Sequence, residues 1–138
     1  MIRTATESDL PAIERLMRSE LGFWHDRWPE GALPKATKAA DGLAFVWEED
    51  AEILGFVCAH DLGFRGYLSE LIVRQDARGR NLGSSLLERV EQELRARGCP
   101  VVIADAWKTA EPFYLRLGWK RPNVVLLSKR FAKEIAGR

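Results

Sequence analysis

The residues best suited to chemistry form a short basic turn that runs from Arg78 to Gly83. The turn follows an apolar run typical of a strand, residues 68–73, and precedes a run with helical spacing that starts near Gly83. The first turn of a helix has unpaired N–H groups and the positive end of the helix dipole, so phosphates bind there. Glycine lets the backbone approach an anion, and arginine adds charge and forked donors. The turn therefore predicts an anion site, although a basic turn before a helix is also common without one.

A second segment, about thirty residues downstream, makes the first one more informative. Residues 110–119 predict a short helix that carries Tyr114 and ends at Gly118. By itself, a tyrosine on such a helix is more often a half-buried core aromatic.

Together these two segments resemble the GNAT family of N-acetyltransferases. In that family a Gln/Arg-x-x-Gly-x-Gly/Ala pattern cradles the pyrophosphate of acetyl-CoA, and a downstream Ala-x-x-Phe/Leu-Tyr-x-x-x-Gly-Phe pattern carries the tyrosine. The positions that match here are Arg78, Asn81 and Gly83 in the first pattern, and Ala110, Tyr114, Gly118 and Trp119 in the second. The resemblance extends more loosely over almost the whole chain.

The resemblance implies acetyl-CoA as the co-substrate and assigns the turn to its pyrophosphate. The implied binding residues in the turn are Arg78, Gly79, Arg80, Asn81, Leu82, Gly83 and Ser84. Asn81 departs from the usual glycine, but Asn tolerates a positive φ better than other side chains, so we expect the turn to survive. Other phosphate motifs, Gly-x-x-x-x-Gly-Lys-Ser/Thr and a Gly-x-Gly-x-x-Gly that opens a strand–helix–strand unit, are absent from the sequence.

The strand before the turn supplies the other implied contacts. In the resembled family the pantetheine lies along this strand, and backbone N–H groups near a bulge bind the thioester carbonyl, which is oxyanion-type stabilisation. By register these donors are Leu71, Ile72 and Val73, whose side chains would pack in the core at the same time. Trp107 stands where many members carry an Asn that hydrogen-bonds the pantetheine, so we expect that contact to be lost or rebuilt from backbone.

Glu70 and Tyr114 are the predicted catalytic pair. Glu70 interrupts an otherwise apolar strand, and burial of a carboxylate favours its use as a general base. Acetylation needs a neutral amine, so a base must take a proton directly or through water. The alternatives for Glu70 are an exposed edge position or an ion pair with an arginine. The resemblance makes Tyr114 the acid toward the departing CoA thiolate.

Candidates for the acceptor site are Trp24, His25, Trp28 and His60. In the implied fold the loop around Trp24 walls the acceptor pocket, and its aromatics could form a cage that attracts an amine by cation–π contact. A hydrophobic lid or a dimer patch would explain the same residues. Either histidine could instead be the base, whereas Cys58 and Cys99 are not expected to act as nucleophiles.

The composition narrows the class of protein. A chain of 138 residues with 46% apolar and 30% charged residues is an ordinary globular protein, and its net charge of +1 gives no case for nucleic acid or membrane partners. The two cysteines and two histidines lack metal-ligand spacing, so we expect no metal. No apolar run approaches the ~20 residues that span a bilayer, and the N-terminus lacks a signal-peptide pattern. A cytoplasmic location is expected.

Periodicity predicts an alternation of strands and helices. The expected strands are residues 2–4, 43–48, 52–60, 67–73, 101–106 and 124–128, and the expected helices are a first one capped by Ser8, a weak one at 35–40, a clear one at 83–97, and a short one capped by Thr109. The first strands have short connections and should be antiparallel, while residues 67–106 should form a right-handed parallel crossover. The predicted class is α/β, with a mixed (α+β) central sheet and helices on both faces, in one domain over residues 1–138. This is also the acyl-CoA N-acyltransferase fold that the resemblance implies.

The sequence therefore predicts an acetyl-CoA-dependent N-acetyltransferase that acts on a primary amine in a ternary complex. One rival is a non-catalytic acyl-CoA-binding regulator on the same fold. Another is a nucleotide-binding module that uses the basic turn, which the sequence disfavours because no carboxylate pair for Mg²⁺ stands near the turn. The identity of the amine stays open, and so does a homodimer.

Overall fold

The structure is a computed structural model that describes residues 1–131. Within these residues the strands form one five-stranded sheet in the order β1-β2-β3-β4-β5. The strands are β1 (Ile2–Thr4), β2 (Ala44–Glu49), β3 (Glu52–Asp61), β4 (Gly66–Val73) and β5 (Val102–Ile103). Neighbours from β1 to β4 are antiparallel, and β4 and β5 are parallel. The short β2–β3 and β3–β4 connections predict their antiparallel pairing, whereas the long β1–β2 connection, which contains α1 and α2, does not.

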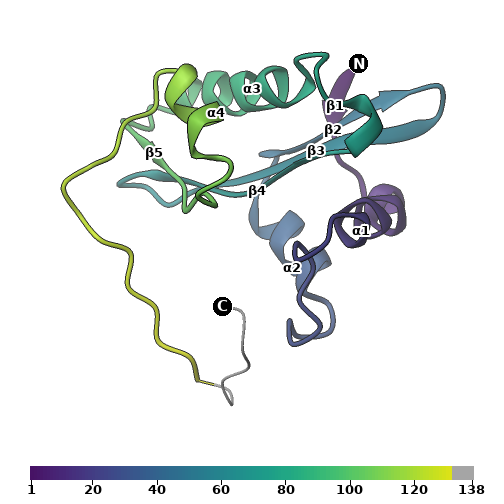
Figure 1. The fold of residues 1–138 in the computed structure, drawn as a ribbon, viewed down its shortest axis with the longest axis horizontal. Helices are drawn as coiled ribbons and strands as arrows, with labels where there is room; N and C mark the ends of the chain where they lie inside the picture. Colours follow the sequence, from purple (N-terminus) through teal and green to yellow (C-terminus); the bar gives the residue numbers. More distant parts are fainter. Residues whose placement is uncertain (132–138) are drawn as a thin grey trace. The chain divides into compact units, whose positions relative to one another are not determined.

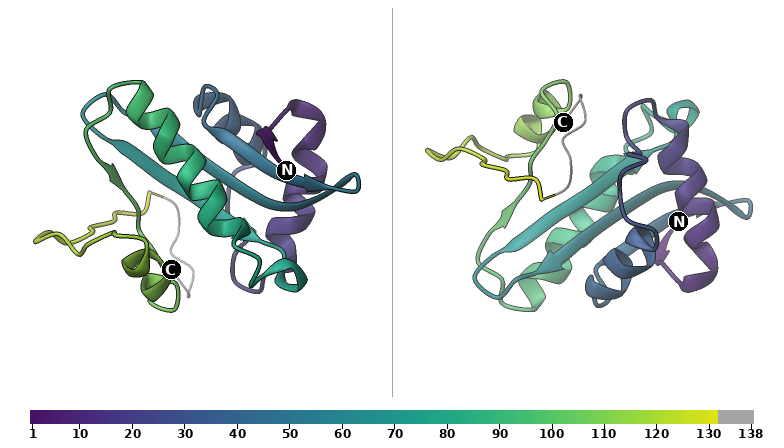
Figure 2. Two further views of the ribbon diagram at one scale, coloured as in Figure 1. Left: turned by 90° about the horizontal axis from the view of Figure 1, so that it is seen from above. Right: turned by 90° about the horizontal axis from the view of Figure 1, so that it is seen from below.

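Helices cover both faces of this sheet, which confirms the predicted class. The helices are α1 (Leu10–Ser19), α2 (Ala32–Ala39), α3 (Leu82–Ala96) and α4 (Glu111–Arg116), with short 3-10 turns η1 (Glu7–Asp9) and η2 (Gln75–Ala77). Helix α3 lies across one face, and α1 and α2 lie on the other (Figures 1 and 2).

The chain divides into two compact units. The first, Met1–Ala104, contains the whole sheet with α1, α2 and α3, and the second, from Asp105 onward, contains α4. In the second unit α4 ends at Gly118, whose φ is +92°, and the Trp119 N–H donates to the carbonyl of Tyr114 at 3.1 Å. The glycine C-terminus predicted for this helix is therefore present. A single domain over residues 1–138 stays a prediction, and its residues 132–138 lie outside the described part.

The core forms where α3 packs on the sheet. All five apolar side chains that the helical spacing places on one face of α3 are buried: Leu82, Leu86, Leu87, Val90 and Leu94. The helix comes close because glycines stand opposite it. A Cβ on Gly55 would lie 2.8 Å from Leu86 Cδ1, and a Cβ on Gly66 would lie 2.9 Å from Leu94 Cδ1. Both glycines are thus required by a close approach rather than by a turn.

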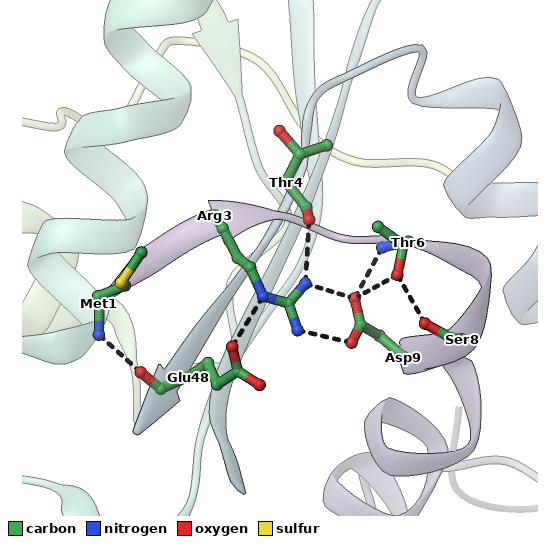
Figure 3. Close-up of polar contacts among 7 residues, drawn as sticks. All are labelled: Met1, Arg3, Thr4, Thr6, Ser8, Asp9 and Glu48. Atoms are coloured by element: carbon green, nitrogen blue, oxygen red, sulfur yellow. Dashed lines mark hydrogen bonds and ion pairs between the residues drawn. The ribbon is translucent and has the colours of Figure 1, made fainter. Parts of the chain in front are cut away.

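An ion-pair network ties the N-terminal strand to the first helix (Figure 3). Arg3 Nη1 and Nη2 donate to the two carboxylate oxygens of Asp9 at 2.7 and 2.8 Å, and Arg3 Nε donates to Glu48 at 3.0 Å. The backbone N–H of Thr6 also donates to Asp9 at 2.7 Å. The predicted cap at Ser8 is therefore wrong. The helical segment starts after Thr6 because Asp9 bonds back to that residue.

Two predicted strands differ in the structure. Of residues 101–106, only Val102–Ile103 form a strand, and Val101 and Ile103 are about half exposed because β5 is the edge of the sheet. Residues 124–128 are extended and exposed, with no strand partner among residues 1–131. Apolar alternation shows that a segment can pair, but not that a partner is present. Helix α4 also lacks the predicted side-chain cap, since its N-cap is Ala110 instead of Thr109.

Candidate active site

The basic turn is held by its two ends. Ala77 and Leu82 are buried in an apolar cluster with Leu54, and Trp47 and Val73 pack against that cluster. The four residues between Ala77 and Leu82 are exposed. The turn is therefore a solvent-facing loop on a fixed base, which suits a binding loop that must not collapse.

The backbone of this loop has the features of an anion site. Gly79 has a φ of +84° and Asn81 a φ of +63°, so Asn81 occupies the left-handed conformation expected of it. Helix α3 begins directly after Asn81. In the described part of the chain, the backbone N–H groups of residues 82–84 have no hydrogen-bond acceptor. The Ser84 and Ser85 hydroxyls donate to the Asn81 carbonyl at 3.0 and 2.8 Å, so neither hydroxyl oxygen caps the helix. The three N–H groups are therefore available to a ligand.

The two arginines of the loop are tethered to neighbouring elements. Arg78 donates to Glu20 at 2.6 Å and to the Val73 carbonyl at 3.1 Å, and Arg80 donates to Glu49 at 2.7 Å. The Arg80 guanidinium lowers the pKa of the Glu49 carboxyl. All four charged side chains are between about a third and a half exposed, so a phosphate can exchange with the carboxylates.

Strand β4 has an unpaired edge next to the loop. On the side of β5 its ladder contains only Gly66 and Tyr67, so in the described residues β4 has no strand partner there from residue 68 onward. The predicted donors Leu71, Ile72 and Val73 all lie in this stretch. Alternate backbone N–H groups there point away from β3. The two parallel strands thus separate where the resemblance places the pantetheine.

A β-bulge lies where this edge opens. Cys58 of β3 pairs with Glu70, and Ala59 pairs with Leu68, so Ser69 is the extra residue of β4. The bulge expected from the resemblance is therefore present, and it lies beside Glu70. Its position could not be read from the sequence, because a bulge depends on the register of two strands.

Four side chains meet on the face of the sheet that α1 and α2 cover. Cys58 and His60 alternate along β3, Glu70 stands opposite Cys58, and Ser69 Oγ lies 3.1 Å from the Cys58 carbonyl and 3.2 Å from His60 Nε2. Two predicted site residues, Glu70 and His60, are therefore brought to one face. Burial raises the pKa of the Cys58 thiol to about 11, which keeps it from acting as a thiolate nucleophile. The sequence reasoning missed Ser69, although a second polar residue beside Glu70 in an apolar strand was a usable signal.

The aromatic residues predicted for the acceptor site form their own cluster. The rings of Trp24 and Trp28 lie 5.1 Å apart, and those of His25 and Trp28 lie 5.2 Å apart. The guanidinium of Arg18 lies 4.5 Å from the centre of the Trp24 ring. The Trp24 ring therefore already makes a cation–π contact, with Arg18 of the protein itself. The cluster belongs to the connection between α1 and α2, and its role in binding an acceptor stays a prediction.

Tyr114 lies in the second unit. Its half-buried ring makes edge contacts with Phe113 and Trp119 at 5.1 and 5.2 Å. Glu111 at the start of α4 receives two hydrogen bonds from Arg121, at 2.6 and 2.7 Å, which fix the turn after the helix. The helix is thus braced, and the role of Tyr114 as an acid stays a prediction.

Residues 1–131 contain neither a cluster of metal-ligating side chains nor a membrane-spanning helix. Within that range, His, Cys, Asp and Glu side chains do not gather in threes or more as a metal ion would need. Also within it, every helix is too short or too polar to cross a membrane.

Comparison with known proteins agrees with this geometry. A sequence profile described as "Acetyltransferase (GNAT) family" matches residues 11–119. A transcriptional regulator from Bacillus halodurans C-125 is similar in structure, with a TM-score of 0.78 and 21% identity over 95% of this chain and 99% of that one. Glucosamine-6-phosphate N-acetyltransferase from Arabidopsis thaliana has a TM-score of 0.74 and 20% identity over 96% and 98% of the two chains. The aminoglycoside N-acetyltransferase AAC(6')-Iy, in a structure with CoA, has a TM-score of 0.72 and 17% identity over 94% and 99%.

These three structures show the fold, and the profile covers most of the chain, including both the basic turn and Tyr114. The chain therefore belongs to the GNAT acetyltransferase family.

Proposed function

We propose that this protein is an N-acetyltransferase that moves an acetyl group from acetyl-CoA to a primary amine by direct attack in a ternary complex. One observation carries the proposal. The unpaired edge of β4 leads into a loop at the start of α3, where backbone N–H groups have no acceptor in the described chain. One run of about fifteen residues therefore offers hydrogen-bond donors for the pantetheine and for the pyrophosphate of an acyl-CoA.

The roles in binding follow from this run. The N–H groups of Leu82, Gly83 and Ser84 and the side chains of Arg78 and Arg80 hold the pyrophosphate, with Gly79 and Asn81 shaping the loop. In the stretch of Leu71, Ile72 and Val73, the backbone groups that point away from β3 hold the pantetheine and polarise the thioester carbonyl.

The roles in chemistry are divided between Glu70 and Tyr114. The carboxylate of Glu70, at the bulge, supplies the negative charge that draws a proton from the attacking amine, directly or through an intervening group. Tyr114 gives a proton to the CoA thiolate as it leaves. No metal takes part in this proposal.

The acceptor is an amine of a small molecule or a protein. Two proteins of the same fold are described as acting on glucosamine 6-phosphate and on aminoglycosides, which supports an amine as the class of acceptor. The aromatic cluster of Trp24, His25 and Trp28 and the side chain of His60 are the proposed acceptor contacts. The net charge of +1 supports neither nucleic acid nor membrane surfaces as partners.

A second candidate function is acyl-CoA binding without turnover. It is favoured by the similarity to a protein described as a transcriptional regulator. A cytoplasmic location and a homodimer are further proposals. Two free cysteines are consistent with a reducing compartment, and light scattering after gel filtration would give the oligomeric state.

Thermal unfolding with acetyl-CoA, CoA and ATP at equal concentrations tests the binding site. A ligand at 100 times its Kd adds about 2.7 kcal/mol, which raises Tm by several degrees. We expect a shift with both CoA species and none with ATP, followed by release of free thiol when an amine panel is added. A shift without thiol release from any amine supports the regulator, and no shift with acetyl-CoA contradicts both functions.

A further inference from the structure

The polar cluster beside the bulge contains more than the predicted base. Ser69 Oγ is within hydrogen-bond distance of two atoms, the Cys58 carbonyl oxygen at 3.1 Å and His60 Nε2 at 3.2 Å. Ser69 and His60 are both half-buried, so the pair is ordered by its neighbours but not sealed from solvent.

Both contacts of Ser69 can be hydrogen bonds at the same time in only one tautomer of a neutral His60 ring. A serine hydroxyl has one hydrogen to donate, and a carbonyl oxygen can only accept. If Ser69 donates its one hydrogen to the Cys58 carbonyl, the contact with His60 is also a hydrogen bond only when Nε2 carries a hydrogen. The neutral ring then has its lone pair on Nδ1. Among the described residues, no hydrogen bond is made by that nitrogen.

The His60 ring has two further neighbours on this face of the sheet, the neutral thiol of Cys58 and the carboxylate of Glu70. The Cys58 sulfur lies 3.8 Å from Nε2, and because burial raises the pKa of this thiol to about 11, it stays protonated. Glu70 stands directly opposite Cys58 on the same face, and the negative charge of Glu70 also raises the pKa of the thiol. A positive ring at His60 would thus have a carboxylate on the same face of the sheet.

We propose that Ser69 is a positioning residue that holds His60 as the Nε2–H tautomer, and that Nδ1 of His60 takes the proton released by the attacking amine. The inference rests on the proposed function and names the intervening group between the amine and Glu70. As the amine nitrogen bonds to the acyl carbon, the carbon–sulfur bond breaks and its electron pair leaves on sulfur. The surplus proton on nitrogen passes to Nδ1, the sulfur takes a proton from the acid, and the products are an amide and a thiol. Glu70 stabilises the imidazolium until the ring gives its proton to water, and the acid regains its own proton from water, so no proton is gained or lost overall.

The tautomer can be tested without any substrate. The chain has two histidines, so His25→Gln leaves His60 as the single source of imidazole NMR signals. In that background we expect ¹⁵N shifts of an Nε2–H ring and an Nε2-bound hydrogen that exchanges slowly with water. Ser69→Ala should lose the slow exchange, and Ser69→Thr, which keeps the hydroxyl, should retain it. An Nδ1–H ring, or a signal unchanged in Ser69→Ala, overturns the role of Ser69.

The proton role is tested by kinetics in the otherwise native protein, with the amine that releases thiol fastest. Loss of a general base lowers rates by about 10² to 10⁴-fold. We expect His60→Gln to lower kcat by at least about 100-fold with the KM for acetyl-CoA unchanged, and Ser69→Ala to lower kcat less, with rescue by Ser69→Thr. Ser128→Ala, an exposed serine of the second unit, serves as the matched control.

An unchanged kcat in His60→Gln overturns the proton role while the proposed function stands. A native protein that acetylates no amine defeats the proposed function and the proton role together. The NMR result still decides in that case whether Ser69 positions the ring, so the two failures are distinguishable.

Discussion

At the scale of single residues, a two-point ion pair that stabilises the fold lies away from the candidate site. The guanidinium of Arg3 holds both oxygens of Asp9, whose side chain is only 9% exposed, and lowers the pKa of that carboxyl to about 2. The contact links the edge strand β1 to the start of α1, which forms part of the layer over the site (Figure 3). Stability of the site's scaffold therefore depends on one ionised carboxylate.

Asp9→Asn should destabilise the protein by about 2 kcal/mol near neutral pH. The pKa of Asp9 is lower in the folded state (about 2) than its ordinary value of 3.8, so its contribution is complete above about pH 4 and is lost as the pH falls toward 2. Urea unfolding between pH 2 and 7 measures this. Asp26→Asn, at a 97% exposed side chain 3.7 Å from Arg18, is the control and should change little. Equal curves for the native protein and Asp9→Asn at pH 6 would contradict the expectation.

Tyr114→Phe should separate catalysis from binding. Removal of one hydroxyl leaves the ring contacts with Phe113 and Trp119, so we expect an unchanged Kd for acetyl-CoA. The loss of a proton donor should lower kcat by about 10² to 10⁴-fold. Thiol-release kinetics and calorimetric titration give the two quantities. Full activity in Tyr114→Phe would exclude the tyrosine as the acid.

At the scale of elements, the strand and helix on either side of the β4–α3 loop could be predicted from the sequence, but their pairing with neighbouring strands could not. The apolar spacing of residues 82–94 and the strand before the loop were predicted to within a residue or two of the observed ends, because periodicity reports which side chains face a core. The bulge at Ser69 and the separation of β4 from β5 were not placed by the spacing of residues, because both depend on the register of neighbouring strands. Side-chain contacts between strands, such as that of Ser69 with His60, could therefore not be predicted from the sequence.

Substitutions at Asn81 test the conformation of this loop. Its φ of +63° is accessible to glycine and asparagine and strained for a β-branched residue. We expect Asn81→Gly to keep acetyl-CoA binding and Asn81→Val to weaken it and to cost about 1 to 3 kcal/mol of stability. Calorimetric titration with CoA and urea unfolding measure both effects. If Asn81→Val bound CoA as tightly as the native protein, the loop backbone would not be the anion site.

At the scale of the whole molecule, the layers were predictable and the C-terminal part was not. The order of β2, β3 and β4 follows from short turns, and the parallel pairing of β4 with β5 follows from the helical connection between them. Residues 124–128 have the same apolar character as the core strands, yet they are exposed, because a strand exists only with a partner. Residues 124–128 of the second unit therefore have the sequence pattern of a strand but make no strand pairing within the described residues.

Packing between the layers has a direct test at Gly55. A methyl group there would lie 2.8 Å from Leu86 of α3, so Gly55→Ala should destabilise the protein by about 1 to 3 kcal/mol. Leu86→Ala creates a cavity and should also destabilise it, but the double variant should be less destabilised than the sum of the two, because each change makes room for the other. Urea unfolding of the four proteins completes the cycle. Strict additivity would show that the two residues do not touch.

The unpaired stretch of β4 has a consequence for handling the protein. A row of backbone donors and acceptors without a strand partner is a template for another chain, and proteins normally blunt such edges with charge, a bulge or a covering segment. Here the bulge at Ser69 twists the edge, and beyond it the stretch is mostly apolar. A pantetheine bound along this edge would occupy the same groups. We therefore expect concentrated protein to aggregate faster without CoA than with it, and light scattering over time would follow this difference.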